Sequence, residues 1–246
     1  MDSQALKTHL EQEHGRGRFS ANLREIVYGG LDGIITTFAV VAGFYGASAL
    51  QNSNDLSLPL TVVLLFGFAN LLADGVSMGV GDFLSTRAEQ KLYERERAKE
   101  AYEVVHNRDM ERQETLNLLR MRGVNPEDCK SMTAIFERNP DLWVDFMMQY
   151  ELEMDDVSDA QPFRSALFTL GSFLLFGFIP LLPFVLGIAS YTFLFSILGA
   201  VFALVALGVT RNRFTREGVY RSVVEVLAMG AVAGVIAYLV GTLFQI

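Results

Sequence analysis

Five long apolar stretches constrain the fold of this chain more than any other feature. They cover, approximately, residues 26–50, 58–83, 165–188, 191–209 and 223–244. A helix needs about 20 apolar residues to cross a hydrocarbon core of about 30 Å. Of the 246 residues 51% are hydrophobic and only 20% are charged, which is unusual for a soluble domain. The sequence therefore predicts an integral membrane protein with five transmembrane helices.

A charged insert, residues 87–161, separates the second and third apolar stretches. Gly123 is typical of a helix C-terminus, Asn125-Pro126 of a helix start, and Asn139-Pro140 of a break before the next helix. The predicted insert helices cover about 87–122, with Asn107 as a candidate break, 126–138 and 141–155. No strand-like alternation is found. The predicted fold class is all-α, with a three-helix insert between transmembrane helices two and three.

Positive charges beside the apolar stretches predict the orientation, because Lys and Arg in short loops are retained in the cytoplasm. Arginines precede the first stretch, Lys and Arg follow the second, and four arginines separate the fourth from the fifth. We expect a cytoplasmic N-terminus and insert, with the C-terminus on the other side. Residues 1–19 lack the apolar core of a removable signal peptide. The expected domains are an N-terminal tail (1–23), helices one and two (24–86), the cytoplasmic metal-binding insert (87–161) and helices three to five (162–246).

Carboxylates lie inside the first two apolar stretches, where ionisable residues are rare and usually face a bundle interior or a wet cavity. Asp32 is in the first stretch. Asn70, Asp74, Met78 and Asp82 follow at i+4 steps along one side of the second. The soft sulfur of Met78 among carboxylates suits a first-row transition metal better than Mg²⁺ or Ca²⁺. The alternative is that Met78 only packs, and that Asp32 and Asp82 are hydrated at the ends of their helices.

The insert carries candidate metal ligands in two E-x-x-E pairs and one Met-Met-x-x-Glu set. They are Glu100, Glu103, Glu111, Glu114, Met147, Met148 and Glu151. In one unbroken helix Glu100 and Glu114 would lie about 21 Å apart. Either the helix breaks near Asn107 and brings the pairs together, or several ions bind in a row. The competing interpretation is a solvated helix face with salt bridges.

Other chemistries find little support in the sequence. Glu103 and His106 form one Glu-x-x-His motif, whereas a di-iron carboxylate site needs two. There is no phosphate-binding Gly-Lys-Ser/Thr loop, and the single cysteine, Cys129, excludes a Cys-based metal cage. Basic residues are mixed with acidic ones, which argues against nucleic acid. We expect a chain that is not an enzyme and has no permanent cofactor; a membrane-anchored di-iron oxidase is the alternative.

Three segments in this order, REIVYGGLDGIITTFAVVAG, GVSMGVGDFLS and WVDFMMQYELEM, resemble the vacuolar iron transporter family, which includes the yeast-type vacuolar iron and manganese importers. The resemblance extends from about Arg24 to the C-terminus. It implies a homodimer with five transmembrane helices per subunit, which moves cytosolic Fe²⁺, or Mn²⁺ in some members, in exchange for protons. It also implies that the ion path follows the dimer interface.

By motif, the resemblance implies that Asp32 and Met78 bind the ion in the membrane, and that the glutamates and methionines of the insert form a metal-binding domain. The chain departs from the family pattern at Asn70, where a glutamate is expected, and at Asp74, where a small residue is expected. If Asp74 replaces that glutamate, the path keeps its charge at a different depth. The implied partners are a second copy, the bilayer, divalent metal ions and protons, in a vacuolar membrane of a eukaryote or the inner membrane of a prokaryote.

Overall fold

The computed structural model describes residues 22–48, 57–188, 191–215 and 218–244, without the side chains of 57–59 and 213–215. Nearly all of the predicted N-terminal tail lies outside these residues. The described chain consists of helices and loops without any β-strand, which confirms the all-α class. It divides into two compact units, unit 1 (Met1–Phe83 and Phe163–Ile246) and unit 2 (Leu84–Pro162).

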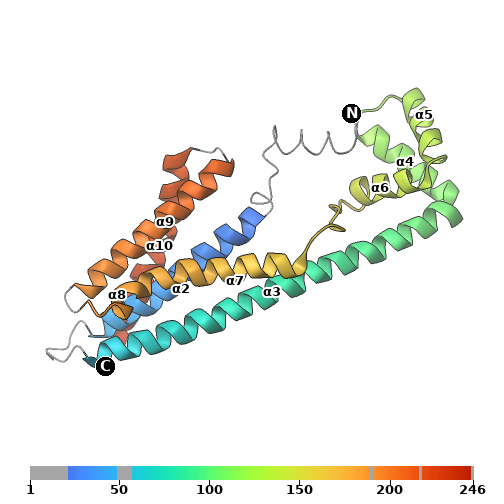
Figure 1. Ribbon diagram of the computed structural model, residues 1–246. Coiled ribbons are helices and arrows are strands. Elements are labelled where there is room, and N and C mark those ends of the chain that lie inside the picture. The colour runs from blue at the N-terminus through green and yellow to red at the C-terminus, as the bar shows by residue number, and fades with distance from the viewer. Residues whose placement is uncertain (1–21, 49–56, 189–190, 216–217, 245–246) are drawn as a thin grey trace, which may run out of the picture. The chain divides into compact units, whose positions relative to one another are not determined.

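Among the described residues, five helices are long and apolar enough to cross a membrane, which confirms the five predicted transmembrane helices (Figure 1). They are α2 (Leu23–Ser48), the first part of α3 (Ser57–His106), α7 (Pro162–Phe178) with its short continuation, α9 (Thr192–Thr215) and α10 (Val219–Leu243).

The third transmembrane segment differs from the single helix predicted over 165–188. After α7 the chain forms a 3₁₀ helix, Ile179–Leu181, and the short helix α8, Leu182–Val185. Pro180 and Pro183 explain the change, because proline has no N–H to donate and its ring clashes with the preceding turn of an α-helix. The freed carbonyl of Pro180 accepts a hydrogen bond from Ser196 Oγ of α9 at 2.8 Å. The irregular turn is therefore tied to the neighbouring helix.

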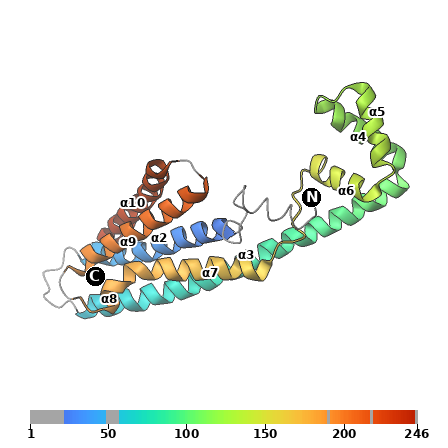
Figure 2. The same cartoon turned by 45° about the horizontal axis from the view of Figure 1, so that its top comes forward.

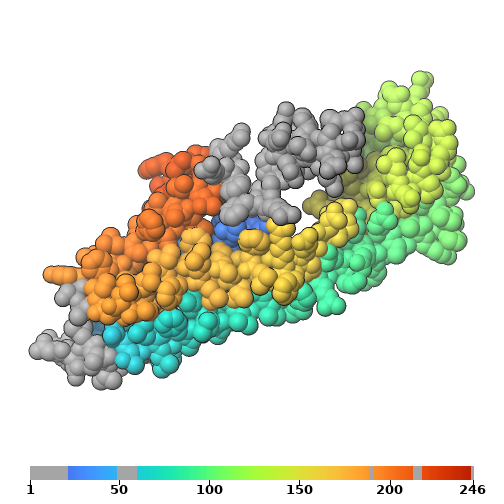
Figure 3. All heavy atoms as spheres, viewed as in Figure 1, coloured from blue at the N-terminus to red at the C-terminus, as the bar shows by residue number. Residues whose placement is uncertain are grey.

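Helix α2 lies between α7 on one side and α9 and α10 on the other (Figures 1 and 2). The glycines beside Asp32 allow the close crossing with α7: a Cβ at Gly29 would lie 2.6 Å from the carbonyl oxygen of Thr169, and Gly33 faces the carbonyl of Phe173. Helix α7 also packs along α3, as the space-filling view shows (Figure 3). Asp32 therefore lies on the central helix of the unit.

Unit 2 contains the end of α3 and the helices α4 (Arg108–Met121), α5 (Pro126–Phe136) and α6 (Pro140–Tyr150). The predicted boundary signals are confirmed: the Asn125 side chain accepts hydrogen bonds from the N–H groups of Glu127 and Asp128, and Gly123 has φ of 84°. Helix α6 ends earlier than the predicted residue 155. Glu153 adopts φ of 51°, a left-handed conformation that ends a helix.

Candidate metal-binding sites

The chain breaks between α3 and α4 at Asn107. Its N–H donates to the carbonyl of Glu103 at 2.7 Å, and its backbone departs from helical geometry at φ −115°, ψ 33°. Two helices instead of one allow Glu100 and Glu111 to approach each other. Of the two alternatives left open by the sequence, the break near Asn107 is confirmed.

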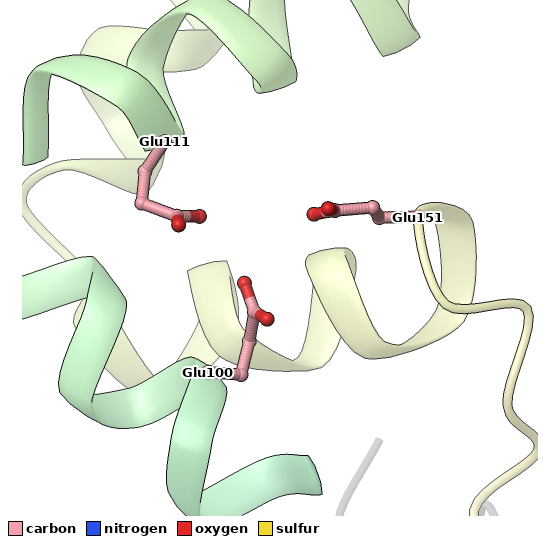
Figure 4. A group of neighbouring side chains, drawn as sticks. All are labelled: Glu100, Glu111 and Glu151. Carbon is pink, nitrogen blue, oxygen red and sulfur yellow. The ribbon is translucent and has the colours of Figure 1, made fainter. Parts of the chain in front are cut away.

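Three carboxylates converge in unit 2, from Glu100 of α3, Glu111 of α4 and Glu151 directly after α6 (Figure 4). One oxygen of each lies within 4.8 Å of the others. Glu100 and Glu111 are each only 3% exposed, whereas Glu151 lies at the surface. One buried oxygen of Glu100 and one of Glu111 have no hydrogen-bond partner among the described residues. Such a group is stable only if protons or a cation offset the repulsion.

Burial and mutual repulsion raise the pKa of all three carboxyls. Burial, followed by the charge of Glu100, raises the pKa of Glu111 to about 8. Although Glu151 lies at the surface, its carboxyl is partly desolvated, and this partial burial, followed by the charges of Glu100 and Glu114, raises its pKa to about 7. A divalent cation would favour the ionised forms instead. The group, which we call the carboxylate triad, can therefore exchange protons for a cation.

Glu103 and Glu114 lie near the triad without joining it. Both charges act on Glu151, and Glu103 is also 3.6 Å from Lys99 Nζ in an i,i+4 ion pair. His106 is exposed and its ring stacks on that of Tyr102. Among the described residues, the triad contains no histidine, so nothing in it favours a di-iron oxidase.

Met147 and Met148 lie in the hydrophobic core of unit 2 and are almost fully buried. The sulfur of Met147 is 3.5 Å from Thr115 Oγ1, and Thr115 is one turn after Glu111. Met147 therefore contacts a residue one helical turn from Glu111, and its role as a ligand stays a prediction. Sequence reasoning did not single out Thr115 and Trp143, which contact each other in this core. The available signal was that Thr115 follows Glu111 by four residues and Trp143 precedes Met147 by four.

The candidate membrane site lies in unit 1, on α2 and α3. Asp32 is half-buried, and Asp74 is near enough to act on it electrostatically. Met78 packs against an apolar cluster that includes Phe173. Among the described residues, Asp32 belongs to no group of three acidic, His or Cys ligands. The roles of Asp32, Asp74 and Met78 as ligands therefore stay predictions.

Two other polar residues of α3 flank this site. One oxygen of Asp82 is buried and has no hydrogen-bond partner among the described residues. Asn70 lines a pocket of about 560 Å³ between α2, α3 and α10 whose other lining residues are apolar. Polar groups at this depth are costly unless they are satisfied.

Comparison with known proteins agrees with this architecture. Residues 23–242 match the family model described as the VIT family. Vacuolar iron transporter 1 of Arabidopsis thaliana is 31% identical over 247 residues, which cover 99% of this chain and 94% of that protein. The vacuolar iron transporter of Toxoplasma gondii is 32% identical over 245 residues, 96% of this chain and 78% of that protein. These relatives are named as transporters, as expected for a chain that is not an enzyme. The chain belongs to the VIT family.

Proposed function

We propose that this chain moves Fe²⁺, and related divalent metals such as Mn²⁺, out of the cytosol in exchange for protons, along a path between the subunits of a homodimer. Membership of the VIT family and the names of the relatives support transport of a metal ion across a membrane. The observation that carries the proposal is the carboxylate triad, whose oxygens lie within 4.8 Å of one another. The host membrane is vacuolar in a eukaryote and the inner membrane in a prokaryote.

Exchange for protons follows from the cost of a carboxylate at membrane depth. Asp32 and Asp74 are tolerated there when a cation or a proton neutralises them. Because the same oxygens cannot hold both, entry of one requires departure of the other. A proton gradient can then drive the metal without ATP, and the sequence contains no phosphate-binding loop.

The dimer proposal is supported by the face of α3 that unit 1 leaves uncovered. Small residues recur there at i+4 steps, and all are exposed: Ala69, Ala73, Ser77 and Gly81. Small residues allow transmembrane helices to approach closely, and a two-fold axis places equivalent residues opposite each other. Asp74 and Met78 each follow a member of this row by one residue. Two copies would therefore bring both sets of Asp74 and Met78 close to the two-fold axis.

The carboxylate triad would capture the ion before it enters the membrane. Its oxygens alone would also accept Mg²⁺, whereas a nearby thioether favours softer transition metals. Met147 and Met148 would supply this preference for transition metals if the helices of unit 2 moved so that the two sulfurs reached the triad. The orientation inferred from Lys and Arg places this capture step in the cytosol.

Transport into proteoliposomes tests the proposal. The purified chain is reconstituted, and uptake of Fe²⁺, Mn²⁺, Co²⁺ and Zn²⁺ is compared with and without an acidic lumen. We expect uptake to depend on the acidic lumen. Asp32→Asn or Met78→Leu should abolish it without unfolding the protein, whereas Met229→Leu, which changes an exposed methionine of α10, should transport normally.

Two results would contradict the proposal in different ways. Full transport by both Asp32→Asn and Met78→Leu would remove these residues from the path. Flux that is indifferent to the pH gradient would exclude proton exchange and indicate a channel.

A further inference from the structure

A short chain of hydrogen bonds links α4 to α6, one helical turn from Glu111 of the carboxylate triad. Trp143 Nε1–H donates to Thr115 Oγ1 at 2.7 Å. The Thr115 hydroxyl has one proton for two neighbours, the carbonyl oxygen of Glu111 at 2.8 Å and the sulfur of Met147 at 3.5 Å. Thr115, Trp143 and Met147 are all 0% exposed. The contacts therefore lie within the core, where water cannot replace them.

The spacing of these residues relates the contacts to the triad. On α4, Glu111 and Thr115 are one helical turn apart. On α6, Trp143 and Met147 are one turn apart, and Glu151 follows after another. Thr115 meets Trp143 and Met147 while Glu111 meets Glu151, so the two helices pair in antiparallel order. A slip by a single residue would move one carboxylate by about 1.5 Å along its helix axis.

Apolar packing alone does not fix such a register. The hydrophobic effect is non-directional, and the rest of this core consists mainly of side chains such as Val104, Leu119 and Phe146. A buried hydrogen bond from Trp143 to Thr115 has a required geometry, and a satisfied buried network specifies one arrangement. The second hydrogen bond of Thr115 extends this constraint to the backbone of Glu111.

We infer that Thr115 and Trp143 are positioning residues that fix the register of α4 against α6, and thereby set the distance between Glu111 and Glu151 for metal binding. The part about metal binding rests on the proposed function of the triad. Groups that orient metal ligands through hydrogen bonds are typically responsible for 10–100-fold in affinity.

Mn²⁺ binding to the full-length protein in detergent tests the metal part of this inference. Thr115→Val keeps the shape of the side chain and removes the hydroxyl, and it should weaken Mn²⁺ binding about 10–100-fold. Thr115→Ser should bind as the unchanged protein does, because it keeps the hydroxyl. Trp143→Phe should resemble Thr115→Val. Thr133→Val is the matched control, since the hydroxyl of buried Thr133 donates to the carbonyl of Cys129 on its own helix.

A distance measurement without metal tests the register itself. Spin labels on Arg120→Cys of α4 and Leu142→Cys of α6, both exposed, report the separation of the helices, and the native Cys129 is buried. We expect the distance distribution to shift or broaden in Thr115→Val and to stay unchanged in Thr115→Ser and Thr133→Val. Circular dichroism confirms that each variant is folded.

The outcomes separate the inference from the proposed function. Unchanged distances together with unchanged Mn²⁺ affinity in Thr115→Val would overturn the inference. Equal loss of Mn²⁺ binding in Thr115→Ser and Thr115→Val would also overturn it, because Thr115→Ser keeps the hydroxyl. If the unchanged protein binds no Mn²⁺ but the distances still respond to Thr115→Val, the triad's proposed role fails while the register assignment is upheld. If neither binding nor a distance change is seen, both are refuted.

Discussion

Raising the pH from 6 to 8 should tighten Mn²⁺ binding to the carboxylate triad by about 500-fold. Carboxylates bind a cation only when ionised, so protons compete with the metal. The pKa values of Glu111 and Glu151 are raised to about 8 and about 7. Both carboxyls therefore hold protons at pH 6, and affinity should increase as the pH passes through these two values.

The magnitude follows from the fraction of molecules in which both carboxyls are ionised. Treated as independent groups, that fraction is about 1 in 1,000 at pH 6, about 1 in 20 at pH 7 and about one half at pH 8. Affinity should therefore rise about 50-fold over the first pH unit and about 10-fold over the second. Above pH 9 it should change little.

Isothermal titration of the full-length protein in detergent measures this dependence, and buffers of different ionisation enthalpy give the number of protons released. Glu111→Gln should weaken binding and flatten the pH profile. His106→Gln, which changes an exposed residue outside the triad, is a control. Glu127→Gln, on the exposed face of α5, should behave as the unchanged protein. An affinity that varies less than about 5-fold between pH 6 and 8 would refute the reasoning.

Three further predictions test other parts of the molecule. Without metal, the free energy of unfolding of unit 2 should fall from about pH 4.5 to about pH 8, because the native state holds protons on Glu111 and Glu151 that the unfolded state releases. In denaturation of Glu111→Gln this fall should be smaller, because the larger of the two contributions is removed. Gly29→Ala should lower the free energy of unfolding by about 1–3 kcal/mol, because the added Cβ would lie 2.6 Å from the Thr169 carbonyl oxygen. Gly171→Ala is the control, because its added Cβ would meet no atom of the described residues within 4 Å. Equal melting temperatures of the two variants in detergent would contradict this prediction. Asn70→Glu should shift the pH dependence of metal flux, because it adds an acid to an apolar pocket, whereas Asn70→Gln should not. Identical pH profiles of metal flux in the two variants would show that this pocket takes no part in transport.

The features that sequence reasoning predicted correctly have local causes. The five transmembrane helices follow from the length of each apolar stretch. The start of α5 follows from the side-chain chemistry of Asn125, and the end of α4 from the freedom of Gly123 to adopt positive φ. The break at Asn107 was one of two alternatives that the E-x-x-E spacing left open, since both alternatives fit the same sequence.

The features that sequence reasoning missed depend on contacts between helices. Glu151 was among the seven candidate ligands of the insert, but which of the seven meet depends on three helices coming together, and no spacing within one helix shows that. Met147 has the same i, i+4 relation to Glu151 whether it is a ligand or a core residue, so its burial could not be predicted. The early end of α6 depends on Glu153 in a left-handed conformation, which is uncommon for glutamate.

The raised pKa values also fit the demands of transport better than those of storage. At pH 7 proton competition would lower the affinity of the proposed triad site about 20-fold relative to carboxylates that are fully ionised. An ion must bind well enough to enter a pathway and weakly enough to leave it. With unit 2 in the cytosol, as proposed, the triad would load a metal by releasing protons, and a local fall in pH would return the metal. The same competition at Asp32 and Asp74 would release the metal on the acidic side of the membrane. The direction of transport would then be set by where protons are abundant rather than by a difference in ligand type.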